Sequence, residues 1–571
     1  MPPLKQVIWK LASRDEAAEN ELAQAAGIHT LIAAILRARG ITSPEAVRDF
    51  LSTDLNSLRD PFELPDMRAA AERIVMAVGN NEPLLVHGDY DADGITATAL
   101  LVRFLSKLGA DVHYYIPHRI NDRYGLSVYA IRQAVAKGIN LIIAVDCGVS
   151  DNDEIAEANK LGAEVIVIDH HEPGPELPDA IVVDYKRHDF KGEADDLAAV
   201  GLAYKVAAAV CMLLEMPVIS LQRAFLDLVA IGTVADVVKL SGDNRIMVKW
   251  GLELLPSTRK EGLQALMDLA GLAGELTAQD IGFRLAPRLN AIGRMAEATD
   301  AVDLLLEDDP DAAMKLALQL EGYNTERRRQ QELIFCEAEA MACEQVDLDS
   351  EPVIVLAGDN WHIGVVGIVA SKVVERFHRP AFLMSRKDDI YRGSARSVEG
   401  FDIAAGLQQC DDLLLRYGGH QLAGGFSLPV DNLEDFRTRL NNIGRTSLRP
   451  QHLLPTINID CEVDIGDVAP DLVEALGLMK PFGHGNRPPV LMSSNVEVAD
   501  VRTVGSDGKH LKLLVGAGHL VFDCIGFGMG SQAAWISRGS RIDLAYTPEF
   551  NEYNGQVSLQ LRLAAVRPTN T

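Results

Sequence analysis

Between residues 83 and 185, short apolar runs rich in valine and isoleucine alternate with stretches of helical apolar spacing. The apolar runs recur at roughly thirty-residue intervals, which is typical of βαβ units. A parallel strand can follow another only after a crossover, usually a helix, has returned the chain to the starting edge of the sheet. The sequence therefore predicts a parallel sheet covered by helices in this part of the chain.

The first of these runs ends in an unusually acidic loop, HGDYDADG. In an open parallel sheet, ligands bind just beyond the carboxyl ends of the strands. Like charges this close are unfavourable unless a cation compensates them. Glycine at 88 and 94 permits tight chain paths where a side chain would obstruct a ligand. The loop carries four candidate ligands, namely His87, Asp89, Asp91 and Asp93.

The same arrangement recurs after two later runs and in one helix. LIIAVDCG places Asp146 just past a strand, and EVIVIDHHE does the same for Asp169, His170 and His171. Asp236 interrupts the apolar helix LVAIGTVADVV, where an unpaired charge is costly. A single aspartate after a strand is usually a cap or turn residue, and Asp236 could pair with an arginine. The conjunction instead favours a metal site, and mixed carboxylate and imidazole ligands suit manganese, or magnesium with fewer histidines.

Composition adds two expectations. The formal net charge of −27 argues against a nucleic-acid partner unless basic residues are concentrated in a channel or cations invert the local field. The first twenty residues have no apolar signal core, and no window approaches the ~18 apolar residues of a membrane span. We therefore expect no membrane association and a cytoplasmic location.

The pattern along the chain predicts five segments. A charged helical stretch separates two α/β regions, and short β-like runs such as HLKLLVGAG dominate the C-terminal part. The predicted segments are a helical region at 1–82, an α/β domain at 83–310, a connecting helix at 311–345, a second α/β domain at 346–449 and a β domain, either a small barrel or a sandwich, at 450–571.

Four motifs resemble those of the DHH phosphoesterase family. HGDYDADG, VDCG, IDHHE and GTVADVV stand in that family's order and spacing, and most of the chain resembles its RecJ exonuclease branch. The resemblance implies an α/β multidomain fold with a parallel-sheet catalytic lobe, an α/β DHH-associated lobe joined by a long helix, and a C-terminal all-β OB-fold. It also implies two ions, Mn²⁺ or Mg²⁺, with Asp146 bridging them. The implied metal ligands are His87, Asp91, Asp93, Asp146, His170 and Asp236.

The resemblance implies roles for further residues. His171 would face the substrate phosphate or its leaving group, while Asp89 and Asp169 would orient ligands. APRLNAIGR resembles a family motif whose Arg294 contacts the phosphate near the cut. A pocket for the 5′ phosphate would include Arg119, with Arg123 as a rival, together with Ser394 and Arg396. The remaining expected phosphate or DNA contacts are Arg288, Asn290, His420, Lys509 and Lys512.

The resemblance thus implies an exonuclease that digests single-stranded DNA in the 5′→3′ direction during recombination and repair. Single-strand-binding protein and a helicase are the implied partners. Two alternatives remain: a DHH phosphohydrolase acting on small substrates such as short oligoribonucleotides, cyclic dinucleotides or pyrophosphate, and a non-catalytic DNA-binding scaffold. The predicted C-terminal β domain argues against the first, because a small substrate needs no long track. The filled ligand positions argue against the second.

Overall fold

The computed structural model describes residues 7–118, 124–518, 520–553 and 555–569. The chain forms two compact units. We call Arg59–Val238 together with Met247–Pro455 the larger unit. We call Met1–Leu58, Lys239–Ile246 and Thr456–Thr571 the barrel unit. The predicted helical region at 1–82 is thus divided at Leu58 between the two units. No helix within the described residues is long and apolar enough to cross a membrane.

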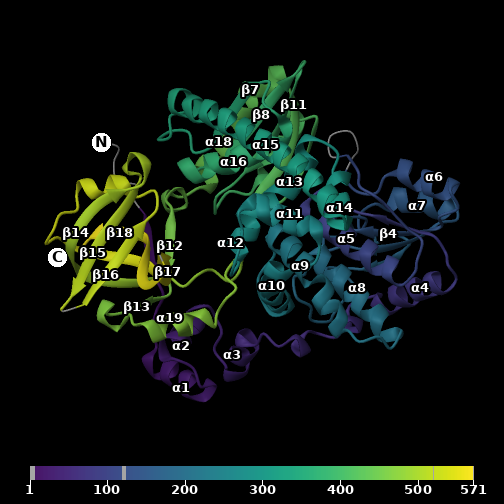
Figure 1. Cartoon of the computed structure of the whole chain (residues 1–571). Helices are drawn as coiled ribbons and strands as arrows, with labels where there is room; N and C mark the ends of the chain where they lie inside the picture. Colours follow the sequence, from purple (N-terminus) through teal and green to yellow (C-terminus); the bar gives the residue numbers. More distant parts are fainter. Residues whose placement is uncertain (1–6, 119–123, 519, 554, 570–571) are drawn as a thin grey trace. The chain divides into compact units, whose positions relative to one another are not determined.

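A five-stranded sheet with the order β3-β2-β4-β5-β6 forms the first lobe of the larger unit, and all its strand pairs are parallel, as predicted. Every residue of β4 is buried, because helices cover both faces of the sheet. Helices α6 and α7 share a core with one face, and α5 and α8 contact strands from the other side (Figure 1). The strands are β2 (Leu84–His87), β3 (Val112–Tyr115), β4 (Leu141–Val145), β5 (Glu164–Ile168) and β6 (Ile181–Val183). The covering helices are α4 (Met67–Gly79), α5 (Ala92–Lys107), α6 (Val128–Ala136), α7 (Asn152–Lys160), α8 (Ala199–Leu213) and α9 (Ile219–Ala235).

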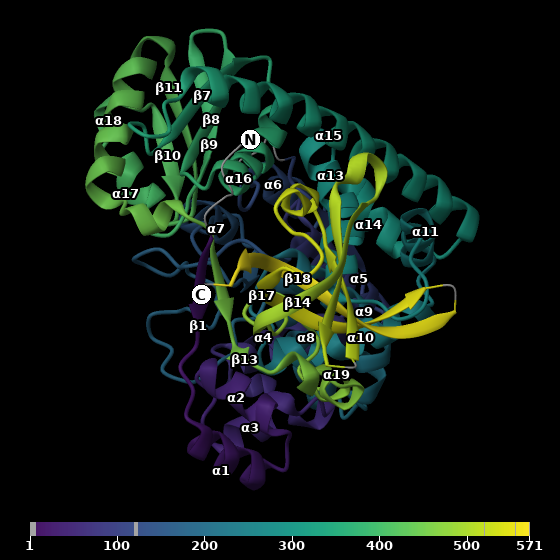
Figure 2. The ribbon, with the colours of Figure 1, turned by 90° about the vertical axis from the view of Figure 1, so that its left-hand side faces the viewer.

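A helical segment leads from this lobe to the next. Its last member, α15 (Pro310–Gln345), is the predicted connecting helix, and Figure 2 shows it reaching from α11 and α14 at one end to the second lobe at the other. Asp309 caps its start and Pro310 occupies its first turn, where the missing N–H costs nothing. The other helices are α10 (Gly242–Leu254), whose residues up to Ile246 belong to the barrel unit, α11 (Glu261–Ala270), α12 (Ala278–Asp280), a π-helical turn (Ile281–Leu285), α13 (Ala286–Met295) and α14 (Thr299–Leu306).

The second lobe of the larger unit contains a mixed five-stranded sheet with the order β10-β11-β9-β8-β7. Only the β7–β8 pair is parallel, because α16 crosses between these two strands, whereas hairpins join β8 to β9 and β10 to β11. The elements are β7 (Ile354–Asp359), α16 (Ile363–Phe377), β8 (Ala381–Lys387), β9 (Ile390–Arg396), α17 (Ile403–Gln408), β10 (Arg416–Gly419), β11 (Ala423–Pro429) and α18 (Leu433–Ser447).

The barrel unit joins the two ends of the chain. Five strands close a barrel in the order β14-β15-β16-β18-β17, because β14 also pairs with β17. Its core is continuous with buried residues of the first helices, such as Ile32 and Leu36. The elements are β1 (Ile8–Leu11), α1 (Glu16–Ala26), α2 (Thr30–Ala38), α3 (Pro44–Leu51), β12 (Thr456–Ile459), β13 (Cys461–Glu462), α19 (Pro470–Gly477), β14 (Leu491–Val504), β15 (His510–Ala517), β16 (Leu520–Gly526), β17 (Arg541–Tyr553) and β18 (Gln556–Pro568).

One element near the N-terminus differs from the prediction. The sequence indicated helices throughout residues 1–82, but Ile8–Leu11 forms strand β1, which pairs in parallel with β12. The strand exists because Thr456–Ile459 offers it a partner, and no local pattern can reveal a partner so distant in sequence.

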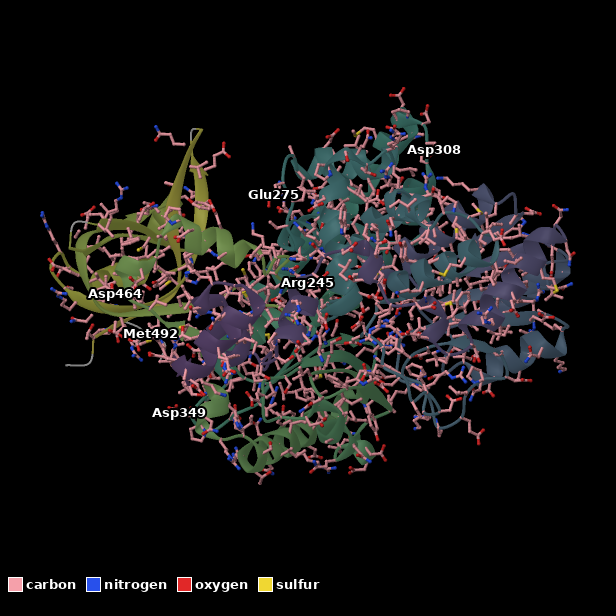
Figure 3. The ribbon with its side chains drawn as sticks, turned by 90° about the horizontal axis from the view of Figure 1, so that it is seen from below. Arg245, Glu275, Asp308, Asp349, Asp464 and Met492 are labelled. Carbon is pink, nitrogen blue, oxygen red and sulfur yellow. The ribbon has the colours of Figure 1, made fainter. Side chains whose placement is uncertain are left out.

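Arg245, labelled in Figure 3, ties together separate segments of the barrel unit. Its side chain is among the largest fully buried ones and donates hydrogen bonds to the carbonyl oxygens of Ser52 (3.0 Å), Leu478 (2.8 Å) and Lys480 (2.7 Å). Burial lowers the pKa of this guanidinium to about 10. The guanidinium also lies over the ring of Phe50, at 5.0 Å from its centroid.

We expect Arg245→Leu to destabilise the barrel unit by about 3 kcal/mol, because three carbonyl groups lose charge-assisted hydrogen bonds in a buried place. Urea unfolding followed by circular dichroism would measure this loss. Arg541→Leu is the control, since Arg541 pairs with Glu497 on the surface and should change stability by less than about 0.5 kcal/mol. Equal effects of the two substitutions would contradict the assignment.

Candidate active site

The carboxyl ends of β2, β4 and β5 meet at one edge of the parallel sheet. Because β4 pairs with both β2 and β5, the residues that follow the three strands converge. Asp91 accepts hydrogen bonds from the backbone N–H groups of Asp93 and Gly94, and so caps α5. A Cβ on Gly94 would lie 2.7 Å from the backbone N and O of Asp89, so only glycine fits here. The acidic loop therefore owes its tight path to a cap and a glycine.

His170 lies at the centre of the converging residues. Its Nε2 is 3.3 Å from Asp146 Oδ1, 3.7 Å from Asp236 Oδ2 and 4.0 Å from Asp93 Oδ2. His170 is buried, and neither of its ring nitrogens has a hydrogen-bond partner within the described part of the chain. Burying polar atoms without partners costs several kcal/mol. A cation among these four side chains would remove that cost, so the donor set fits a divalent metal ion.

The possible ligand atoms fall into compact groups, in each of which they lie within 4.8 Å of one another. Asp146 belongs to two of the three groups, and it lies close to His170, which is a member of the third. This is the position expected of a bridging carboxylate. The groups are Asp93 with His170 and Asp236, Asp89 with Asp91 and Asp146, and Asp146 with His170 and His171.

Asp93 is oriented by the N-terminus of α8, a role that the sequence did not suggest. Its carboxylate accepts hydrogen bonds from the backbone N–H groups of Ala199 (2.7 Å) and Val200 (2.9 Å), the first residues of α8. A helix N-terminus stabilises an anion through these free N–H groups and its dipole. Gly232 of α9 permits the approach, because a Cβ there would lie 2.9 Å from Asp93 Oδ1.

Two backbone positions of the site are strained. Asp146 has a φ of 64°, and Val237, which follows Asp236, has a φ of 62°. This region costs a non-glycine residue of order 1–3 kcal/mol, and a β-branched valine is a clear outlier there. Such strain is concentrated at functional sites, where the surrounding structure holds a side chain in a required direction.

The carboxylates repel one another. Burial, together with the charges of Asp236 and Asp91, raises the pKa of Asp93 well above its ordinary value. Burial, followed by the charge of Asp91, raises the pKa of Asp146 strongly and that of Asp236 to about 7. Burial and the nearby charge of His171 lower the pKa of His170 to about 4. A bound cation would favour the ionised form of these carboxylates and would be coordinated by the neutral imidazole. The group therefore has the donors that a divalent cation requires.

His171 is held differently from His170. Its Nδ1 lies 2.7 Å from Asp169 Oδ1, and although burial opposes protonation, this hydrogen bond and the charge of Asp169 raise the pKa of His171 to about 9. The Tyr124 hydroxyl lies 3.0 Å from His171 Nδ1 and 3.1 Å from the carbonyl oxygen of Asp146. Sequence reasoning missed Tyr124, because nothing local to a tyrosine in a loop indicates which strand end it reaches.

The structure gives His87 and Asp89 different surroundings. His87 is fully buried at the end of β2, and its Nε2 accepts a hydrogen bond from the backbone N–H of Ser127 (3.1 Å). Its Nδ1 lies 3.8 Å from Cys147 Sγ. His87 belongs to none of the ligand groups found within the described residues, whereas Asp89, expected only to orient ligands, joins Asp91 and Asp146. Alternation along the chain could not show which of the two would lie beside Asp91 and Asp146, because strand β2 ends at His87.

The residues of the APRLNAIGR motif have distinct surroundings. Asn290 Oδ1 accepts a hydrogen bond from the backbone N–H of Ala92 (2.8 Å), so it fixes the acidic loop. Arg294 donates to the carbonyl oxygen of Gly364 in α16 (2.9 Å), which links the two lobes of the larger unit. Arg288 is buried and pairs with Glu321 of α15 at 2.6 Å, so in this structure its charge is directed to the connecting helix and not to a phosphate.

The remaining predicted contacts lie elsewhere. Ser394 and Arg396 face Gly367 of α16, where a Cβ would lie 3.3 Å from Ser394 Oγ and 3.4 Å from Arg396 Nη2. His420 is exposed at the turn between β10 and β11. Arg119 and its rival Arg123 lie outside the described residues.

In the barrel unit, the two predicted lysines differ. Lys509 is exposed. Lys512 already pairs with Asp523 at 2.7 Å, which limits its availability to a phosphate.

Comparison with known proteins assigns the three folded regions to families. The chain matches the DHH family N-terminal domain over residues 83–233, the DHHA1 domain over residues 350–445 and the RecJ OB domain over residues 459–565. The first match includes all predicted metal ligands except Asp236.

Curated relatives extend over nearly the whole chain. The single-stranded-DNA-specific exonuclease RecJ of Bacillus subtilis is 38% identical over 97% of this chain and 70% of its own length. That of Escherichia coli is 33% identical over 94% of this chain and 96% of its own length. The crystal structure of RecJ from Thermus thermophilus in complex with Mn²⁺ superposes with a TM-score of 0.83 at 29% identity, covering 99% of this chain and 80% of that one.

We expect the protein to bind manganese at two sites that can be removed separately. Asp236→Asn should abolish one binding equivalent and Asp89→Asn the other, because each belongs to a different ligand group. Isothermal titration calorimetry would measure the stoichiometry. His188→Asn, at an exposed histidine outside the groups, is the control and should leave it unchanged. A full complement in Asp236→Asn would refute this division of ligands.

Proposed function

This chain belongs to the RecJ family of DHH phosphoesterases, and we propose that it is a metal-dependent exonuclease that removes nucleotides from the 5′ end of single-stranded DNA. The observation that carries the proposal is the gathering of three carboxylates around the buried, unpartnered imidazole of His170. The proposal is also supported by relatives named single-stranded-DNA-specific exonucleases that match nearly the full length.

We assign one manganese or magnesium ion to Asp93, Asp146, His170 and Asp236. A second ion falls to Asp89, Asp91 and Asp146. This assignment replaces His87 by Asp89, in keeping with the ligand groups. When bound there, the two divalent cations would lower the pKa of a water molecule and neutralise charge on the phosphate oxygens.

The residues beside the ligands supply orientation and protons. Asp169 holds His171 by its Nδ1 and favours its protonated form, so the ring can donate a proton to the leaving 3′ oxygen. Tyr124 contacts the same ring and the backbone of Asp146, which fixes their spacing. Arg294, held by the Gly364 carbonyl, is our candidate for the contact with the scissile phosphate.

The 5′ polarity is proposed to come from a pocket for the terminal phosphate made by Ser394, Arg396 and Arg119. The closeness of Ser394 and Arg396 to α16 supports the first two members. A fixed clamp for the 5′ end beside the metal ligands would set how much is released per cut. A narrow entrance would select single strands, since a duplex is wider.

The C-terminal barrel favours a long substrate over a small one. Barrels of the OB type bind single strands through grooves with basic and aromatic residues, which a phosphohydrolase of dinucleotides does not need. We therefore place the enzyme in DNA recombination and repair, with single-strand-binding protein and a helicase as proposed partners.

We expect the protein with Mn²⁺ to release label from 5′-labelled single strands at once and from 3′-labelled strands only at the end. Asp146→Asn should lower kcat by at least about a thousandfold, because the shared carboxylate contributes several kcal/mol of transition-state stabilisation through the ions. Gel analysis of both labels would measure polarity and rate. Asp111→Asn, at an exposed aspartate before β3, should leave the rate unchanged. Early release of 3′ label would contradict the polarity, and an active Asp146→Asn protein would contradict the site.

His171 can be separated from the ligands by a second variant. We expect His171→Asn to reduce kcat by about 10²–10⁴-fold, the usual contribution of a general acid, while binding of manganese keeps its stoichiometry. Loss of a metal equivalent would instead make His171 a ligand, as its place in one ligand group allows. Single-turnover digestion and calorimetry on the same protein distinguish the two roles.

A further inference from the structure

The second lobe carries a groove of which the proposed function uses only Ser394, the member it shares with the pocket for the 5′ phosphate. Helix α16 packs on β8 and β9, and the face of the sheet beyond it is open along β9, β11 and β10. The groove has a volume of about 540 Å³. Its polar lining includes Arg392, Ser394, Arg416 and Ser427, and its apolar lining includes Ile363, Leu415 and Tyr417.

Two arginines flank the groove in one cross-strand row. Arg392 pairs with Ser427, and Ser427 pairs with Arg416, so all three side chains project from the same face. Two strand spacings separate the arginines, or about 10 Å between their Cα atoms. Both are exposed, and neither has a side-chain hydrogen bond or ion pair with any residue that the structure describes. Unpaired positive charge so close together is notable in a chain of net charge −27.

Of the glycine-rich motif at residues 418–425, Gly425 lines the groove and Gly418 is its cross-strand neighbour. A Cβ on Gly424 would lie 2.7 Å from Ile403, and Gly419 has a φ of 146°, so packing and backbone require these two. Gly418 has nothing within 4 Å of its Cβ position, and Gly425 has only one backbone oxygen at 4.0 Å. Glycine weakens a strand interior and often marks close approach of a ligand. The protein's own packing gives no reason for Gly418 and Gly425, but a ligand in the groove does.

We propose that this groove binds the phosphodiester backbone of the single-stranded substrate, with Arg392 and Arg416 each contacting a phosphate. Guanidinium groups suit phosphate because they donate paired hydrogen bonds and keep their charge. Gly418 and Gly425 leave room for the strand, and the exposed Ile363 and Ile390 offer apolar surface to sugars and bases. The groove continues from Ser394, which pairs with Gly425, so this inference rests on the proposed function and extends its substrate track.

The test is the salt dependence of binding with all metal chelated, so that no strand is cut. Each phosphate contact on a single strand adds about 0.7 to the slope of log K against log salt concentration. We therefore expect Arg392→Gln with Arg416→Gln to reduce the slope by about 1.4 and to weaken binding about a hundredfold at low salt. Fluorescence anisotropy with a labelled oligothymidylate measures both quantities.

Arg386→Gln is the matched control. Arg386 lies on the same sheet but alternates to the other face, and its side chain donates to the carbonyl oxygen of Asp388. It should leave the slope unchanged. An unchanged slope in the double variant would overturn the proposal. So would binding of a free deoxynucleoside monophosphate as tight as that of the strand, since the groove would then take a small anion.

The glycines give an independent variant without a change of charge. Gly418→Ala and Gly425→Ala place a methyl group in open space, so the thermal midpoint should not fall, whereas strand binding should weaken with the slope retained. Unweakened binding by the folded double alanine variant would also count against the groove. Digestion assays distinguish the two proposals. If the unsubstituted protein binds strands but does not hydrolyse them, the exonuclease proposal is wrong. If the double arginine variant hydrolyses strands normally and its slope is unchanged, only the groove proposal is wrong.

Discussion

The mutual repulsion of buried carboxylates at one edge of a parallel sheet is the constraint on which the rest of the larger unit depends. Asp93 and Asp146 are almost fully buried beside one another's charge, and such an arrangement persists only if the surroundings compensate it. Part of the compensation is built in: the first N–H groups of α8 stabilise Asp93. The rest of the carboxylate repulsion requires bound cations to offset it. The cluster is therefore suited to metal binding and is not merely an ion-pair network.

That requirement explains several otherwise costly features. Left-handed backbone at Asp146 and Val237 aims carboxylates that a relaxed chain would turn elsewhere. Glycines at 94 and 232 sit where any Cβ would strike the acidic loop or the Asp93 carboxylate. Asn290 and Arg294 then fasten the loop and the second lobe to α13. The surrounding helices and the connecting helix thus hold the strained backbone and the side chains of the site in place.

The two histidines of the DHH sequence, His170 and His171, have different protonation states and therefore different chemical roles. Adjacent in sequence, they differ in pKa by several units, because His170 faces only the buried cluster whereas His171 has Asp169 as a hydrogen-bond partner. A neutral ring suits a metal ligand and a protonated ring suits an acid. In the second lobe, adjacent glycines also differ in role. Backbone conformation and packing require Gly419 and Gly424, whereas the space beside Gly418 and Gly425 is open.

The sequence alone determined the parallel sheet, the connecting helix, the C-terminal β domain and the strand ends that carry the site, because period and composition are local properties that burial imposes on every strand and helix. It also singled out Asp91, Asp93, Asp146, His170 and Asp236, since polar residues after buried strands are visible along the chain. Only the tertiary structure placed Asp89 beside Asp91 and Asp146, gave His87 the backbone of Ser127 as a partner, paired β1 with β12, turned Arg288 toward α15 and brought Tyr124 to His171. Each of these depends on which distant segment a side chain meets, and that is fixed by packing, which no local pattern records.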